Sequence, residues 1–561
     1  MLTRREFLQV TAAATALGLT ARPQSVLAGN RITQEDLLDF ESLGQVTLLN
    51  FTDIHAQLVP LYYREPDTNL GIGADRGRPP HLTGKALLEY FGLPAGGPEA
   101  YAFSHLDFTR LAHEYGRVGG LAHLATLINA IRAERSGRTL LIDNGDTWQG
   151  SYTSLRTRGA DMVRAMNALG VDAMTAHWEF TYGAERVREL TGQLKFPFLA
   201  GNVRDTEWEE PVFESTARFE RGGLDIAVIG QAFPYTPVAN PRHLIPDWAF
   251  GIRRAEIQAS ADAARSSGAD LVVLASHNGF DVDHKLAGLV RGIDVILTGH
   301  THDAIPKVMR VGDTLLVAAG SHGKFLARLD LDVANRRIRD FRFRLIPVLS
   351  DTIVPDPAID ALVKEIRAPY RETLDTVLGR TESLLYRRGN FNGSFDDLIC
   401  QAIRTERDTE ISLSPGFRWG GALLPGQDIR VEDVYNQTAI TYPNCYRMEM
   451  TGERIKAILE DVADNLFNVD PFYRQGGDMV RVGGLGYGID VTRPMGERIR
   501  DLVLWPENRP VDPDKSYLVG GWASVNPSVE GPPVYDVVSD YLRGHPEVRL
   551  EEQRTVRVLK S

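Results

Sequence analysis

The chain has 561 residues and a formal net charge of −12, with 43% hydrophobic and 24% charged residues. A single hydrophobic core rarely extends over so long a chain, so we expect two domains. The acidic balance argues against a protein that wraps a nucleic acid backbone, because such a protein needs a basic face. Beyond the N-terminus there is no run of about eighteen apolar residues, so we expect no membrane span.

Residues 1–28 have the features of an export signal. The pair Arg4-Arg5 precedes a mildly apolar stretch from Val10 to Ala21, and small residues end the segment at Ala28. A twin-arginine pair with this continuation predicts a Tat-type signal peptide. We therefore expect a periplasmic protein that is exported after folding and cleaved after Ala28.

From Val46 to about Val348, apolar segments alternate with amphipathic ones, which predicts layered α/β packing. The strongest strand candidates are 46–51, 139–142, 271–274 and 294–297, and the clearest helices are 120–135 and 253–267. Residues 60–115 break the alternation, because they are rich in proline and glycine. We interpret 29–350 as one domain with an insertion at 60–115, which either borders the site or serves packing.

A proline-rich boundary near 347–357 precedes a helical linker at 351–379 and a second domain at 380–561. The second domain mixes expected helices (396–407 and 452–462) with short expected strands (445–450 and 516–520), which indicates an α+β unit. It also holds the two cysteines of the chain, Cys400 and Cys445. Both cysteines lie in hydrophobic surroundings. They could form a disulfide or remain as two buried free thiols, and the sequence favours neither alternative.

Carboxylate and imidazole groups follow four of the expected strands. The candidate metal ligands are Asp53, His55, Asp146, His177, His277, His300 and His302. Groups at the carboxyl ends of parallel strands meet at one edge of the sheet. Asp and His in this proportion suit two divalent ions, and a carboxylate must bridge such a pair. Asp146 is the expected bridge, whereas Asp143 is expected to fix the turn before it.

The ordered series D-x-H, G-D, H, H, G-H-x-H resembles the calcineurin-like metallophosphoesterases. Three further segments resemble the bacterial 5′-nucleotidase family within them: Val118 to Ala122, Ser394 to Ala402, and Tyr442-Pro443-Asn444 with Met450 to Glu453. The resemblance runs from about Val46 to Val558. It implies a four-layer α/β/β/α metal domain and an α+β C-terminal domain that binds substrate across the cleft. Asp53, His55, Asp146 and His302 would bind one ion, and Asp146, His177, His277 and His300 the other.

One segment departs from that family. Where its phosphoesterases carry G-N-H-E-F-D, residues 176–181 read A-H-W-E-F-T. By register His177 takes a ligand position, Trp178 replaces the catalytic histidine, and Thr181 replaces the aspartate that orients that histidine. Either activity has been lost, or the substrate has a leaving group that needs no general acid, such as a persulfide. A Trp face suits a sulfur-rich, weakly hydrated group.

This pattern resembles the SoxB-type thiosulfohydrolases of the bacterial sulfur-oxidation system. The resemblance implies two divalent ions, usually Mn²⁺ with Zn²⁺ as the alternative. It also implies hydrolysis of the terminal sulfonate from a cysteine S-thiosulfonate on the SoxYZ carrier, with a metal-bound hydroxide as the nucleophile and sulfate as the product. A 5′-nucleotidase or related phosphoesterase, and a non-catalytic metal-bearing binding protein, are the alternatives.

The resemblance also suggests substrate contacts. Arg418 lies where the nucleotidases carry an N-G-G-x-R loop, and its guanidinium can form forked hydrogen bonds with an oxyanion, although a surface salt bridge is the alternative. Tyr442 and Tyr487 correspond to aromatics that hold a base, and here they would line a channel for a carrier peptide or belong to the core. We expect Asp146, Trp178 and Arg418 to act directly on the reaction.

Overall fold

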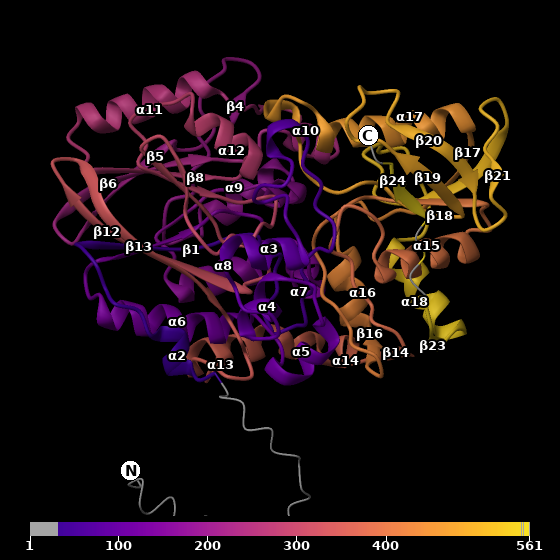
Figure 1. Ribbon diagram of the computed structural model, residues 1–561, viewed down its shortest axis with the longest axis horizontal. Coiled ribbons are helices and arrows are strands. Elements are labelled where there is room, and N and C mark those ends of the chain that lie inside the picture. Colours follow the sequence, from indigo (N-terminus) through magenta and orange to yellow (C-terminus); the bar gives the residue numbers. More distant parts are fainter. Residues whose placement is uncertain (1–31, 551–552, 554, 560–561) are drawn as a thin grey trace, which may run out of the picture.

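The computed structural model describes residues 32–550, 553 and 555–559, in two lobes that lie side by side (Figure 1). The indigo to magenta lobe is the N-terminal domain, and the orange to yellow lobe is the C-terminal domain. The expected export signal lies outside the described residues. Within the described ranges, no helix has both the length and the apolar character needed to cross a membrane.

Two stacked sheets form the centre of the N-terminal domain. The first has the order β13-β12-β1-β2-β3, and the second has the order β10-β11-β9-β8-β6-β5. Their strands are β13 (Arg337–Pro347), β12 (Phe325–Ala334), β1 (Val46–Phe51), β2 (Thr139–Asp143), β3 (Ala173–Met174), β10 (Met309–Val311), β11 (Thr314–Ala318), β9 (Val295–Thr298), β8 (Leu271–Ser276), β6 (Leu224–Gln231) and β5 (Thr216–Arg221). Strands β1, β2 and β3 are parallel, as are β6, β8, β9 and β11. All four strands expected in this domain are therefore present.

Alternate faces of these strands are buried against different layers, because successive side chains point to opposite sides of a sheet. Leu48 of β1 packs with Val273 of β8 in the core between the sheets, whereas Leu49 packs toward helices. Those helices are α6 (Leu121–Glu134), α8 (Ala160–Leu169) and α13 (Pro357–Arg367), while α11 (Arg254–Ser266) and α12 (Phe280–Ala287) cover the second sheet. The expected α/β/β/α layering is confirmed.

The proline-rich segment 60–115 is ordered. It contains η1 (Gly73–Asp75), α3 (Gly84–Phe91), α4 (Pro98–Phe103) and α5 (Phe108–Tyr115). Tyr101 and Leu111 are buried in the core of the first layer. Tyr62 pairs with Ala422 of the C-terminal domain in an isolated bridge. The segment thus packs between the domains.

The linker between the domains is shorter than expected. Helix α13 passes through η4 (Ala368–Tyr370) into α14 (Arg371–Leu374), and β14 (Val377–Thr381) follows at once. The expectation of a helical linker up to residue 379 was wrong at this end, because residues 377–381 pair with two other strands of the C-terminal domain. Tertiary pairing therefore overrides the local helical pattern.

The C-terminal domain packs small sheets against helices. Its strands are β16 (Asp428–Arg430), β14 and β23 (Glu547–Val548); β17 (Tyr446–Thr451), β22 (Ser516–Gly521), β15 (Ile411–Ser414) and β18 (Arg481–Gly483); and β21 (Arg509–Pro510), β20 (Ile499–Leu504), β19 (Leu485–Ile489) and β24 (Val556–Val558). Its helices are α15 (Ser394–Glu406), α16 (Val431–Thr438), α17 (Gly452–Phe467) and α18 (Val534–Gly544), with η5 (Pro471–Tyr473). Cys400 and Cys445 are buried free thiols.

Shorter elements complete the described chain. They are α2 (Gln34–Leu38), α7 (Tyr152–Thr157), η2 (Trp178–Tyr182), α9 (Ala184–Thr191), α10 (Thr236–Ala239), η3 (Arg242–Leu244), and the pair β4 (Arg204–Asp205) and β7 (Trp248–Ala249). Among these, η2 and α10 lie next to the site described below.

Candidate metal centre

Five loops at the carboxyl ends of parallel strands carry the seven expected ligands. Asp53 and His55 follow β1, Asp146 follows β2, His177 follows β3, His277 follows β8, and His300 and His302 follow β9. All seven side chains are buried. The stacking of the two sheets brings these loops together at one end of the domain, as expected for sites in open α/β sheets.

The seven ligands form two groups that share Asp146. One group is Asp53, His55, Asp146 and His302, and the other is Asp146, His177, His277 and His300. Within each group one donor atom from every residue lies within 4.8 Å of the others. A carboxylate common to two such groups is the arrangement that a pair of bridged divalent ions requires.

The donor atoms fit divalent cations. Nε2 of His55 lies 3.0 Å from Nε2 of His302, which in turn lies 3.1 Å from Oδ1 of Asp53. Nδ1 of His177 lies 3.0 Å from Oδ2 of Asp146. Imidazole nitrogens and carboxylate oxygens that converge in this way point their lone pairs at a common position. Divalent cations such as Mn²⁺ and Zn²⁺ bind to such a set of donor atoms.

The backbone conformation of the loops orients these side chains. Asp53, His55, Asp146, His300 and His302 all have positive φ, between 49° and 77°. Such φ values are uncommon for residues other than glycine, and they cluster at functional sites when the surrounding structure holds them. Each residue reverses the chain just past its strand, which turns the side chain toward the centre.

Two buried carboxylates hold the loop of the shared ligand. Glu179 accepts hydrogen bonds from the backbone N–H groups of Asp146 (3.3 Å), Thr147 (2.6 Å), Trp148 (3.2 Å) and His177 (2.7 Å). Asp143 accepts from the N–H of Gly145 (2.9 Å), so its expected role in the turn is confirmed. Glu179 therefore joins the second and third ligand loops, a role that the sequence pattern did not reveal.

The electrostatic surroundings favour cation binding. Burial alone would raise the pKa of Asp146, but the imidazoles of His177, His55 and His277 hold it well below its ordinary value. Burial lowers the pKa of His177 to about 4 and also holds that of His300 well below its ordinary value. Neutral imidazole and ionised carboxylate are the forms that bind metal.

Asp53 behaves differently. Burial raises its pKa to about 8, although the neighbouring His277 opposes the shift. Burial would lower the pKa of His277, but Asp53 and Asp146 raise it to about 9. Binding of a cation at this position must therefore displace protons.

A cavity of about 290 Å³ opens onto the metal centre between the domains. Trp178 forms one apolar wall, and its ring meets those of Phe417 and Trp419 edge to face at 5.4 and 5.3 Å. The backbone N–H of Trp178 donates to Oδ1 of Asp146 at 2.9 Å, which holds this wall beside the carboxylate shared by the two groups. Thr181 pairs with Thr441 at 2.5 Å and orients no imidazole.

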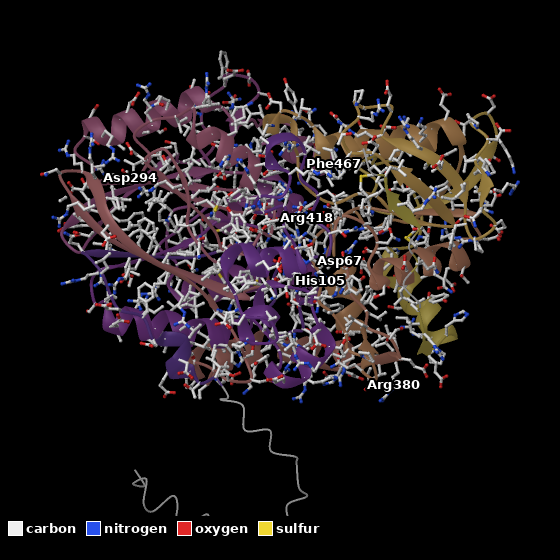
Figure 2. All side chains as sticks on the ribbon, viewed as in Figure 1. Asp67, His105, Asp294, Arg380, Arg418 and Phe467 are labelled. Carbon is white, nitrogen blue, oxygen red and sulfur yellow. The ribbon has the colours of Figure 1, made fainter. Side chains whose placement is uncertain are left out.

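Arg418 lies in the middle of the molecule, where the two lobes meet (Figure 2). Its guanidinium lines the cavity and donates to the carbonyl oxygens of Thr301 and Gly477, and it also pairs with Asp478 at 3.4 Å. Two of its five N–H groups have no partner in these contacts. The alternative of a surface salt bridge does not describe this largely buried group.

The two tyrosines differ. Tyr442 lines the cavity and donates its hydroxyl to the carbonyl of Ala239 at 2.7 Å. Tyr487 is buried in the core of the C-terminal domain with Leu485 and Ile489, away from the metal centre. The structure therefore does not bring Tyr487 to the cavity, because its side chain belongs to the same buried cluster as Ile455 and Leu459 of helix α17. Among the described residues, none that lines the cavity comes from 60–115.

Known 5′-nucleotidases resemble this chain in sequence and in fold. A family model for the 5′-nucleotidase C-terminal domain matches residues 377–525. A 5′-nucleotidase from Rattus norvegicus is 25% identical over 492 residues, covering 78% of this chain and 82% of its own. A solved 5′-nucleotidase precursor from Thermus thermophilus is 21% identical with a TM-score of 0.72, covering 92% of this chain and 99% of its own, and it supports the fold.

The solved structure of the sulfate thiohydrolase SoxB from Thermus thermophilus is more similar. It is 39% identical with a TM-score of 0.90, covering 93% of this chain and 98% of its own. The layered metal domain, the paired His/Asp groups and the nucleotidase-type second domain define a hydrolase of the 5′-nucleotidase and metallophosphoesterase superfamily. Within that superfamily, the chain belongs to the SoxB family.

Proposed function

We propose that this protein hydrolyses the terminal sulfonate from a cysteine S-thiosulfonate on the SoxYZ carrier and releases sulfate. The 39% identity to a sulfate thiohydrolase over nearly the whole chain supports the reaction class. The observation that carries the proposal is Trp178 beside the bridging Asp146, in the place of the phosphoesterase general acid. The rings of Phe417 and Trp419, which pack against Trp178, are likewise unable to donate a proton to an alkoxide, and the neighbouring imidazole of His177 would be bound to metal.

The reaction balances without an added reductant. The oxygen of water adds to the sulfonate sulfur, and the bond from that sulfur to the inner sulfur breaks. The electron pair stays on the inner sulfur, which leaves as a persulfide, and both water protons are released. A persulfide is a weaker base than an alkoxide, so its departure needs no protonation.

Two divalent ions, with Mn²⁺ as our first choice and Zn²⁺ as the alternative, would supply a lowered pKa of bound water and a positive charge for sulfonate oxygens. Asp146 would hold both ions, and the two groups around it one ion each. Arg418 would add hydrogen bonds to the sulfonate, and Trp178 with Phe417 would exclude water from the sulfur chain. Tyr442 would border the path of the carrier arm.

We place the protein in the periplasm after Tat export. The twin-arginine segment at Arg4-Arg5 motivates this placement. Fusion of residues 1–28 to a reporter should carry the reporter to the periplasm only while the Tat pathway works. Replacement of both arginines by lysine should abolish that export, and unaffected export would contradict the placement.

A direct assay tests the reaction. Purified protein loaded with Mn²⁺ should release sulfate from thiosulfonated SoxYZ and little phosphate from AMP. The second candidate is a 5′-nucleotidase, which the matched C-terminal domain and the 25% identical relative favour. Strong AMP turnover without sulfate release would replace our proposal with that one. Metal binding without either activity would favour a binding protein.

A further inference from the structure

The loop that carries His300 and His302 is held by the other domain. The carbonyl oxygen of Thr301, between these two ligands, accepts hydrogen bonds from Arg388 and Arg418, both at 3.0 Å. Nε2 of His300 lies 2.8 Å from the carbonyl oxygen of Gln475. Three contacts from the C-terminal domain thus reach a loop that serves both metal groups.

The contact at His300 selects one form of the ring. A carbonyl can only accept, so Nε2 of His300 must carry the proton, and Nδ1 is left as the lone-pair donor. Nδ1 of His300 is buried and has no hydrogen-bond partner among the described residues. A metal-ligating histidine usually donates its other N–H to such an acceptor, which fixes the ring and raises its basicity.

The Gln475 carbonyl is itself held in place. Arg474, the preceding residue, is buried and pairs with Asp281 of α12 at 2.5 Å and with Asp75 of the 60–115 insertion at 2.7 Å. The next residue, Gly476, has a φ of +77° and lies so close to the ring that a Cβ there would be 2.4 Å from Nε2 of His300. The segment therefore fits His300 only with glycine at this position.

We propose that the Gln475 carbonyl is a positioning group for His300, so that the C-terminal domain sets the affinity of the ion bound by Asp146, His177, His277 and His300. This inference rests on the metal centre proposed above. The other ion would be bound through Asp53, His55 and His302 together with the shared carboxylate. In the described hydrogen bonds no carbonyl of the C-terminal domain reaches the imidazoles of that group, so it provides an internal reference.

Two neighbouring glycines offer a matched pair of variants. Gly476→Ala drives a methyl group into His300, whereas Gly477→Ala has the same φ of +77° and meets nothing closer than the carbonyl oxygen of Gly416 at 3.6 Å. Both carry the same backbone strain, and only the first disturbs His300. Titration of the metal-free full chain with Mn²⁺, together with the Mn²⁺ EPR spectrum, reports each ion separately.

We expect wild type and Gly477→Ala to bind two ions with the spectrum of a coupled pair. Gly476→Ala should keep one ion and bind the second about 10–100-fold more weakly, the range for loss of a group that orients a ligand. Its spectrum should change to that of an isolated Mn²⁺. Equal affinities in both variants, or the same loss in both, would overturn the inference.

Arg474→Gln provides a second route if Gly476→Ala fails to fold. Loss of the pairs with Asp75 and Asp281 should loosen the Gln475 carbonyl and weaken the same ion by a smaller factor. Unchanged affinity for both ions in Arg474→Gln would also contradict the inference. Wild type that binds two ions but releases no sulfate would instead contradict the proposed function alone.

Discussion

The ligand loops and the cavity walls are built in different ways. The ligands lie one to four residues past the ends of parallel strands, and buried hydrogen bonds such as those of Glu179 fix their turns. The C-terminal walls, Phe417, Arg418 and Trp419, come from a loop after β15 that reaches the site through the contact between domains. The candidate metal groups therefore depend first on strand ends of the two stacked sheets, whereas the shape of the cavity depends on how the two domains fit together.

The most severe test of this division removes the shared ligand. Asp146→Asn should prevent tight binding of two ions and lower the rate of sulfate release by at least about 10²–10³-fold, as for loss of one key electrostatic group. Metal analysis and the sulfate assay measure both effects. Asp161→Asn changes a buried carboxylate that bonds to Thr157 away from the ligands, so it should keep both ions. An Asp146→Asn variant with both ions and full activity would refute the bridge.

The frame of the ligand loops can be tested without touching a ligand. Glu179→Gln replaces an acceptor with an amide that can satisfy fewer of the four N–H groups, so the free energy of unfolding should fall by about 2–4 kcal/mol. Urea unfolding of the metal-free protein measures this change. Glu220→Gln, on an exposed position of β5, should leave stability unchanged. Equal stability of the two variants would mean that Glu179 does not hold the loops.

Metal binding should depend on pH, because the candidate ligands are titratable, whereas the apolar rings of the cavity walls are not. Burial raises the pKa of Asp53 to about 8, so at lower pH its carboxyl group keeps a proton that the cation must displace. Burial and its acidic neighbours leave His277 with a pKa of about 9, so its proton must be displaced as well. Apparent Mn²⁺ affinity should therefore rise about tenfold per pH unit for each displaced proton and level off only above about pH 9. Titration calorimetry in buffers of different ionisation enthalpy counts the released protons. Affinity that falls with rising pH would contradict this sign.

The smallest effect is expected away from both regions. Tyr487 lies in the C-terminal core, and its hydroxyl is buried without a hydrogen-bond partner among the described residues. Tyr487→Phe should leave sulfate release unchanged and alter stability by no more than about 1 kcal/mol, in either direction. Tyr442→Phe, which removes a bond to Ala239 at the cavity, is the comparison. A large loss of activity in Tyr487→Phe would mean that Tyr487 does contribute to the site.

The same division explains what the sequence could predict. Long apolar runs predicted β1, β2, β8 and β9, and polar residues after these strands belong to the two groups that could hold metal ions. The strand before His177 has only two residues, Ala173–Met174, so no periodic signal preceded that ligand. Its assignment depended on the family resemblance.

Features that depend on long-range packing were not predictable. Nothing local marks Glu179 as the acceptor of four N–H groups, because its partners lie in two separate loops. The position of Tyr487 depends on which face of β19 meets α17, and its glycine-rich surroundings give no amphipathic pattern. The Gln475 carbonyl has no side-chain signature at all, and only the docking of the two domains reveals it.

In the hydrogen bonds of the described residues, the carboxylate of Glu179 accepts only from backbone N–H groups. The hydrogen bonds that hold this turn therefore do not involve the side chains at positions 177 and 178. A histidine can replace an asparagine, and a tryptophan a histidine, while the main chain keeps its course. An anchor of this kind allows the side chains that face the cavity to change without a change of fold.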